Sequence, residues 1–229
     1  MTEPPTHPAG AAWAQLDRAW KLAFEGAWEA VRTGNIGVGA VATDPDGAVM
    51  AVGRNRVAET EPPLGQLAGT SLAHAEMNVL AQLPFRSPKN LVLSTTLEPC
   101  LQCSAAIRLG PISQIRFAGR DPFWEGCADF TSLGPWLARR EPVPREGPLP
   151  HRLGWFAVML ARFGPGLTPH VESARRQDGE GPLIDLANQL EHSGRWSKLL
   201  ELDVAAFLVE VWDHLGEAAD AMTGPAPER

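Results

Sequence analysis

The sequence predicts an α/β fold in which helices cover both faces of a mixed β-sheet. Three observations favour this fold: an N-terminal segment with helical apolar spacing, a hairpin motif directly after it, and two later helical segments that alternate with short apolar strands. The order helix, hairpin, helix, strand, helix, strand is typical of three-layer α/β/α domains. A mainly helical extension is expected after this domain.

The first helix is expected to begin near Trp13. Apolar side chains recur there at steps of three and four residues, with charged residues on the other face, and Gly34 ends the pattern. The apolar positions are Trp13, Leu16, Trp20, Phe24, Ala27 and Val31. Residues 1–10 contain three prolines and are expected to form a flexible tail.

A β-hairpin is expected next. Residues 36–43 and 48–55 have the composition of strands, and the sequence Asp-Pro-Asp-Gly at positions 44–47 lies between them. Aspartate, proline and glycine favour tight turns for backbone reasons, so the two strands should pair in an antiparallel manner.

Two helices and two strands should complete the sheet region. One helix is expected from Thr70 or Ser71 to about Leu83, where Pro84 stops it. A second should begin at Pro99 and run to Leu109. Residues 90–95 and 112–118 are the expected strands.

The domain boundaries follow from these patterns. Residues 11–140 are expected to form the α/β domain, and residues 141–150, with four prolines, a linker. Residues 151–229 are expected to form the helical extension, because Leu200, Val204 and Phe207 begin an apolar stripe that continues to Leu215.

Composition excludes several classes of protein. The chain has 229 residues, 44% of them hydrophobic and 21% charged, as in ordinary globular proteins. Its net charge is −7, of which −5 lies after residue 150, so a dedicated nucleic-acid grip is not expected. The longest apolar segment, residues 155–161, is too short for a membrane span, and no signal peptide is recognised. With only three cysteines, a cytoplasmic location is expected.

The chemistry-bearing residues form two short motifs. His74 precedes Glu76 by two positions, and Cys100 and Cys103 lie three apart at the start of a predicted helix, which places their sulfurs on one face. A helix N-terminus favours thiolates, and two thiolates with one imidazole suit Zn²⁺. Three protein ligands leave one position for water, which is the pattern of catalytic zinc. We therefore expect one zinc ion per chain.

Glu76 is the expected proton shuttle. Zinc lowers the pKa of a bound water from 15.7 to roughly 7, so a zinc-bound hydroxide can act as nucleophile at neutral pH. Glu76, on a different side of its helix from His74, can take the water's proton and pass it on. Attack on a cyclic amidine carbon would release ammonia.

These motifs resemble the cytidine deaminase-like superfamily, whose signature is H-x-E with P-C-x-x-C. Residues 96–103, Thr-Leu-Glu-Pro-Cys-Leu-Gln-Cys, look most like the branch of tRNA adenosine deaminases and guanine deaminases, and so do residues 38–41 and 53–55. The resemblance covers about residues 13–135. It implies a five-stranded sheet and a homodimer.

The resemblance also assigns site residues. His74, Cys100 and Cys103 match the zinc ligands, and Glu76 matches the proton shuttle. Asn55 matches an asparagine that hydrogen-bonds the substrate, and the backbone around Ala75 and Glu98 would line the pocket. The chain departs from the branch at Gly37, at Ala105-Ala106 and in the long loop 59–71, which leaves the identity of the base open.

Several of these residues have alternative interpretations. Trp124 or Phe123 could stack on a flat ring or pack in the core or a dimer interface. Cys127 could close the zinc site as a fourth ligand or be a free, partly buried thiol. Asn55 could be a turn former, and a lone C-x-x-C could be a redox pair.

Three functions remain open at this point. The first is zinc-dependent deamination of a nucleobase, nucleoside or related small heterocycle. The second is tRNA adenosine-to-inosine editing, which the motifs support and the acidic charge opposes. The third is a non-catalytic scaffold with structural zinc. The role of the extension is not predicted.

Overall fold

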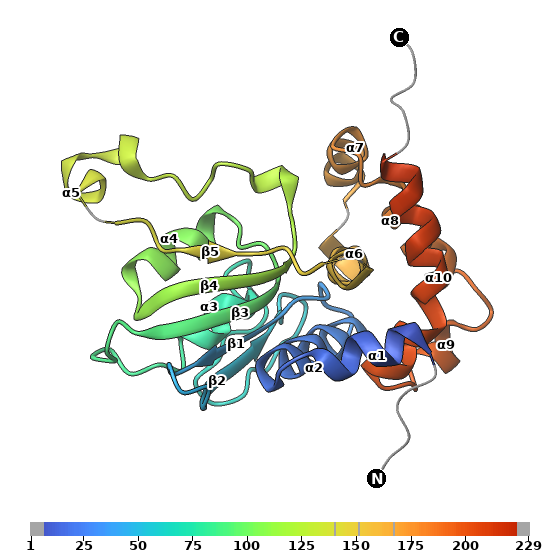
Figure 1. Cartoon of the computed structure of the whole chain (residues 1–229), viewed down its shortest axis with the longest axis horizontal. Coiled ribbons are helices and arrows are strands. Elements are labelled where there is room, and N and C mark those ends of the chain that lie inside the picture. Colours follow the sequence, from blue (N-terminus) through green and yellow to red (C-terminus); the bar gives the residue numbers. More distant parts are fainter. Residues whose placement is uncertain (1–6, 140, 151, 167, 224–229) are drawn as a thin grey trace.

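The computed structural model describes residues 7–139, 141–150, 152–166 and 168–223. Its centre is a five-stranded sheet with the strand order β2-β1-β3-β4-β5 (Figure 1). The strands are β1 (Gly39–Thr43), β2 (Val49–Arg54), β3 (Leu91–Leu97), β4 (Ile112–Gly119) and β5 (Arg145–Glu146). The mixed sheet that the sequence predicts is therefore confirmed.

Strand direction places several chain segments at one edge of the sheet. β1 is antiparallel to β2 and β3, whereas β3, β4 and β5 are parallel. The predicted hairpin turn forms, with Asp44 Oδ1 accepting the backbone N–H of Asp46 and Ala48. The end of β2, the end of β3 and the end of β4 consequently meet at the same edge.

Helices cover both faces of the sheet, as predicted. α2 (Arg18–Arg32) and α6 (Arg152–Leu160) pack on one face, and α3 (Ala75–Leu80) and α4 (Leu101–Leu109) on the other (Figure 1). α3 and α4 both begin at the edge where β3 and β4 end. This arrangement brings the two sequence motifs together.

The N-terminal region differs from the prediction. Two helices replace the single expected one: α1 (Pro8–Gln15) and α2. Asp17 starts the second, because its carboxylate accepts the backbone N–H of Trp20 at 2.9 Å. The predicted tail was wrong at its end, since α1 begins at Pro8, where a proline suits the first helical turn. Residues 1–6 of that tail lie outside the described residues.

The predicted linker also needs correction. β5 lies within residues 141–150 and pairs with β4, and the N–H of Ile115 donates to the carbonyl of Pro144. Prolines flank this short strand rather than interrupt it, which an edge strand tolerates. The segment therefore supplies the fifth strand of the sheet.

The remaining helices follow or precede β5. The chain after β5 forms α7 (Pro169–Gln177), α8 (Gly181–Glu191), α9 (Trp196–Leu199) and α10 (Val204–Thr223). Short elements are η1 (Pro122–Trp124), η2 (Thr131–Leu133), α5 (Pro135–Ala138) and η3 (Gly164–Gly166). None of the described helices combines the length and apolar character that a membrane span requires.

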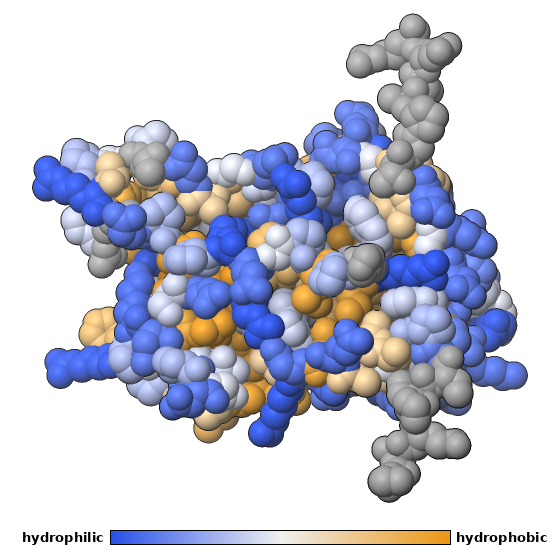
Figure 2. Space-filling model, in the orientation of Figure 1, coloured by the Kyte–Doolittle hydropathy of each residue, from blue (hydrophilic) through white to orange (hydrophobic). Residues whose placement is uncertain are grey.

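The extension shares its core with the sheet region. Trp28 of α2 stacks on Phe207 of α10 with ring centroids 4.1 Å apart, and Trp28 donates to the carbonyl of Leu202 at 2.8 Å. A Cβ on Gly119 of β4 would lie 2.8 Å from a methyl carbon of Val158, so α6 approaches this strand very closely. Figure 2 shows hydrophilic residues over most of the visible face, with hydrophobic patches over the sheet and beside the C-terminal helices. The boundary at residues 141–150 therefore does not divide the buried core.

Candidate metal centre and active site

His74 and Cys100 occupy equivalent positions at the starts of two helices. His74 is the N-cap of α3 and Cys100 is the N-cap of α4. The predicted helices began earlier, at Thr70 or Ser71 and at Pro99; the observed helices are shorter. Neither side chain makes the usual N-capping hydrogen bond. Both are consequently free to face each other.

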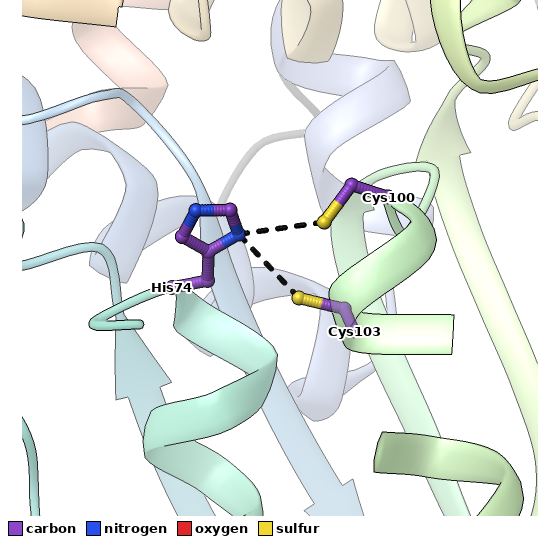
Figure 3. Close-up of side chains that lie close together, drawn as sticks. All are labelled: His74, Cys100 and Cys103. Carbon is purple, nitrogen blue, oxygen red and sulfur yellow. Dashed lines mark hydrogen bonds between the residues drawn. The ribbon is translucent and has the colours of Figure 1, made fainter. Parts of the chain in front are cut away.

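His74, Cys100 and Cys103 form a compact ligand set (Figure 3). His74 Nδ1 lies 3.6 Å from Cys100 Sγ and 3.5 Å from Cys103 Sγ. All three ligand atoms lie within 4.8 Å of one another. A tetrahedral ion with Zn–S near 2.3 Å and Zn–N of about 2.0–2.1 Å separates nitrogen and sulfur by about 3.5 Å. One imidazole and two sulfurs at this spacing fit zinc.

The electrostatics of the cluster favour metal binding. The hydrogen bond with Cys103 is the main cause that lowers the pKa of Cys100 to about 4; the bond to His74 adds to it against the effect of burial. The pKa of Cys103 is raised well above its usual value, because its thiol hydrogen-bonds to Cys100 and is buried. The hydrogen bond between His74 and Cys100 raises the pKa of His74. The lowered pKa favours the thiolate form of Cys100, which is the form that binds a metal ion.

Glu76 lies beside this ligand set and is buried, with 4% of its surface exposed. Thr95 donates its hydroxyl to Oε1 at 3.2 Å, and Cys103 Sγ lies 3.4 Å from Oε2. Burial, followed by the charge of Cys100, raises the pKa of Glu76. A carboxyl group whose pKa is raised in this way is suited to accept and return a proton. Thr95, which fixes its orientation, was not identified from the sequence.

A cavity of about 230 Å³ opens next to the cluster. Drug-sized ligands usually occupy pockets of roughly 300–1,000 Å³, so this space suits a single base-sized ring. Its wall combines the predicted site residues with residues that precede β1 and residues of the C-terminal extension. The lining residues are Ile36, Val38, Asn55, His74, Ala75, Glu76, Leu97, Glu98, Cys100, Asp121, Phe123, Trp124, Ala161, Arg162, Val171 and Arg175.

The four predicted substrate-binding residues all border this cavity. Asn55 is 3% exposed, its Oδ1 accepts the N–H of Val57 at 3.2 Å, and its Nδ2 has no hydrogen-bond partner among the described residues. Ala75, Glu98 and Trp124 line the wall as well. The Glu98 carboxylate binds Arg145 and the backbone N–H of Asp121, so it fixes the loop after β4. The roles of these residues toward a substrate stay predictions.

Cys127 lies apart from the ligand set. Within the described part of the chain, the group of possible metal ligands contains His74, Cys100 and Cys103. Cys127 Sγ instead lies 3.9 Å from Ser104 Oγ and 3.8 Å from the carbonyl of Pro99. This position favours the free, partly buried thiol over the fourth ligand.

Sequence reasoning did not identify the residues that the extension contributes. Arg162 and Arg175 line the cavity together with Asp121, and Glu180 lies behind them. No motif surrounds these residues, and Arg162, Arg175 and Glu180 lie outside the segment that resembles a known family. The only available signal was the position of Asp121 just after β4, where loops often line pockets.

Comparisons with known proteins agree with this site. Residues 14–118 match the family model of the cytidine and deoxycytidylate deaminase zinc-binding region. The tRNA-specific adenosine deaminase 2 of Xenopus tropicalis is 31% identical over 121 residues, which cover 48% of this chain and 66% of that protein. The Xenopus laevis protein of the same name is also 31% identical, with 64% of its length covered. The chain thus spans somewhat less than two thirds of these curated relatives.

Solved structures of deaminases are also similar. One comes from a study of A-to-I editing by tRNA:A34 deaminases; it is 28% identical, has a TM-score of 0.47, and the match covers 56% of this chain and 96% of that chain. A guanine deaminase from Nitrosomonas europaea is 20% identical with a TM-score of 0.45, covering 64% and 83% of the two chains.

The ligand set and the matched segment resemble those of a zinc-binding deaminase domain. Residues 14–118 are similar to the cytidine and deoxycytidylate deaminase family, in agreement with the resemblance seen in the sequence. Members of this family are zinc-dependent hydrolases that act on C–N bonds.

Proposed function

We propose that the protein deaminates a nucleobase, nucleoside or related small heterocycle by zinc-dependent hydrolysis. The observation that carries this proposal is the buried Glu76 carboxyl, which contacts Cys103 and borders the same cavity as His74 and Cys100. A structural zinc site needs no such carboxyl beside it and no cavity. The arrangement therefore opposes the scaffold hypothesis.

Each site residue has a separate role in the proposed reaction. When bound, zinc would be held by His74, Cys100 and Cys103 and would supply the Lewis acidity that activates a water molecule. Glu76 would take a proton from the attacking water and return protons to the ring nitrogen and to the leaving amino group. A C–O bond forms, the exocyclic C–N bond breaks, and ammonia leaves. Thr95 holds Glu76 in place, and Asn55 Nδ2 is available to the edge of the ring.

Ammonia release from zinc-loaded protein tests the proposal. The test compounds are cytosine, guanine and adenine with their nucleosides and nucleotides. We expect turnover of at least one compound, and none after Glu76→Gln. Absence of turnover across the panel, with one zinc per chain confirmed by elemental analysis, would contradict the proposal.

A second candidate is tRNA adenosine-to-inosine editing. The names of the two Xenopus relatives favour it. The net charge of −7 opposes it, because phosphate contacts require lysine and arginine. Inosine detection after incubation with tRNA, at several salt concentrations, distinguishes this function from the first.

A homodimer and a cytoplasmic location remain part of the proposal. An apolar groove between α3 and α4 supports the dimer: Phe85 is fully exposed beside it and Leu109 is 65% exposed. Light scattering during size-exclusion chromatography tests the dimer, and cell fractionation tests the location.

A further inference from the structure

The C-terminal extension forms one wall of the cavity. Val171 and Arg175 lie one helical turn apart on α7, and both line the space beside Glu76 and Asn55, as do Ala161 and Arg162 after α6. The opposite wall comes from the zinc motifs. One side of the site therefore belongs to residues 14–118, which match the family model. The other side belongs to the extension, which lies outside that match.

Buried charges hold this wall in place. Asp121 accepts two hydrogen bonds from Arg175, at 2.7 and 3.1 Å, and Glu180 accepts bonds of 2.6 and 2.9 Å from Arg162. Arg175 also reaches Glu180 at 3.2 Å. All four residues are at most 7% exposed, and their charges balance. Buried pairs of this kind are costly to break, because a lone charge would remain.

Arg175 presents two recognition elements at this wall. Its guanidinium lies 5.0 Å from the ring centre of Phe123, which is 37% exposed at the rim of the cavity. Its Nη atoms are engaged by Asp121 and Glu180, whereas Nε has no partner among the described residues. A flat guanidinium can pack its face against one ring, here that of Phe123, while a spare in-plane N–H donates to an acceptor on the edge of a second ring.

We propose that Arg175 is a specificity-determining residue and that, with Val171, it forms a roof over the substrate. This inference rests on the proposed deaminase function. The roof selects a free, compact heterocycle with a hydrogen-bond acceptor on its outer edge. It excludes a base that remains attached to a polynucleotide, because such a base needs an open mouth for its flanking chain.

Binding by zinc-loaded full-length protein tests the roof. Isothermal titration with guanine, adenine, cytosine and an anticodon stem–loop RNA is carried out in the Glu76→Gln background, so that no turnover interferes. The variants are Arg175→Met, Arg175→Lys and Val171→Trp. Arg176→Met is the matched control, since Arg176 is the next residue of α7 and pairs with Glu172 and Asp185 outside the cavity. Zinc content and melting temperature are measured for each.

We expect the parent to bind a free base and not the stem–loop. Arg175→Met and Val171→Trp should each raise Kd for that base at least about tenfold, with Arg176→Met within about twofold of the parent. Arg175→Lys, which keeps the charge, should fall between. Should Arg175→Met fail to fold, Val171→Trp decides, because it leaves the charge network intact.

Two results would overturn the roof while leaving the deaminase function standing. One is an unchanged Kd in both Val171→Trp and Arg175→Met; the other is binding of the stem–loop as tight as that of the free base. Failure of the zinc-loaded parent to bind any free base would instead contradict the proposed function, and the roof with it.

Discussion

Asp121 and Arg175 are 54 positions apart in the chain, yet the carboxylate of one holds the guanidinium of the other through two buried hydrogen bonds. Asp121 follows β4 by two residues, and Arg175 belongs to α7 of the extension. This pair joins the sheet edge that carries the zinc motifs to a helix outside them. The extension is therefore part of the site rather than an appendage.

Glu76→Gln should remove activity while the protein stays folded and keeps zinc. Glutamine has the same shape but cannot carry a proton, and general acid–base catalysis contributes about 10²–10⁴-fold in rate. Initial rates of ammonia release measure the loss. The exposed Glu25, changed to glutamine, is the control and should keep the parent rate. Residual activity near the parent level would show that Glu76 is not the shuttle.

Cys103→Ser should abolish zinc binding, whereas Cys127→Ser should retain it. Cys103 Sγ is 3.5 Å from His74 Nδ1, while Cys127 contacts Ser104 outside the ligand set. Elemental analysis of both purified variants gives the comparison. A chelator should lower the melting temperature of the parent and of Cys127→Ser, and zinc should restore it. Loss of zinc from Cys127→Ser would show that the site has a fourth protein ligand.

The zinc motifs could be predicted from the sequence because their spacing is local. Cys100 and Cys103 lie one helical turn apart, so their sulfurs share a face wherever the helix is packed. Glu76 follows His74 at the start of one short helix, and the turn at residues 44–47 is fixed by its own residue types. Such features need no knowledge of distant segments.

The cavity wall could not be predicted in the same way. Arg162 and Arg175 line it only because α6 packs onto the sheet and α7 packs on α8, and the position of α6 depends on distant apolar side chains such as Phe207. The fifth strand was missed because prolines dominate residues 141–150 and hide a two-residue strand. The break before α2 depends on one hydrogen bond that the Asp17 carboxylate accepts from the backbone N–H of Trp20, which apolar periodicity does not reveal.

Phe207→Ala should destabilise the whole protein. Phe207 is fully buried in α10 and stacks on Trp28 of α2. Replacing a buried phenylalanine by alanine costs about 3–5 kcal/mol. Denaturant titration should show one earlier transition in the near-ultraviolet and far-ultraviolet signals. Val209→Ala, at a 38% exposed position of the same helix, should change stability by less than about 0.5 kcal/mol. Separate unfolding of the extension would contradict a shared core.

Glu59→Gln should reduce stability at neutral pH but not in acid. Burial raises the pKa of Glu59, yet hydrogen bonds from Arg54 and Arg56 outweigh it, so the pKa lies below the usual 4.5. A carboxyl with a lowered folded-state pKa stabilises the native state above its unfolded pKa, and this contribution is lost as pH falls through the folded value. Because the cluster lies near the surface and is partly screened, we expect a loss of about 1 kcal/mol at pH 7. Urea titrations at pH 7 and at successively lower pH should therefore show the parent and Glu59→Gln converging below pH 4.5. The control is Glu61→Gln, at an exposed position of the same loop, which should have the same stability as the parent at every pH. If the stability difference between the parent and Glu59→Gln persists in acid, the Glu59 side chain acts through packing rather than charge.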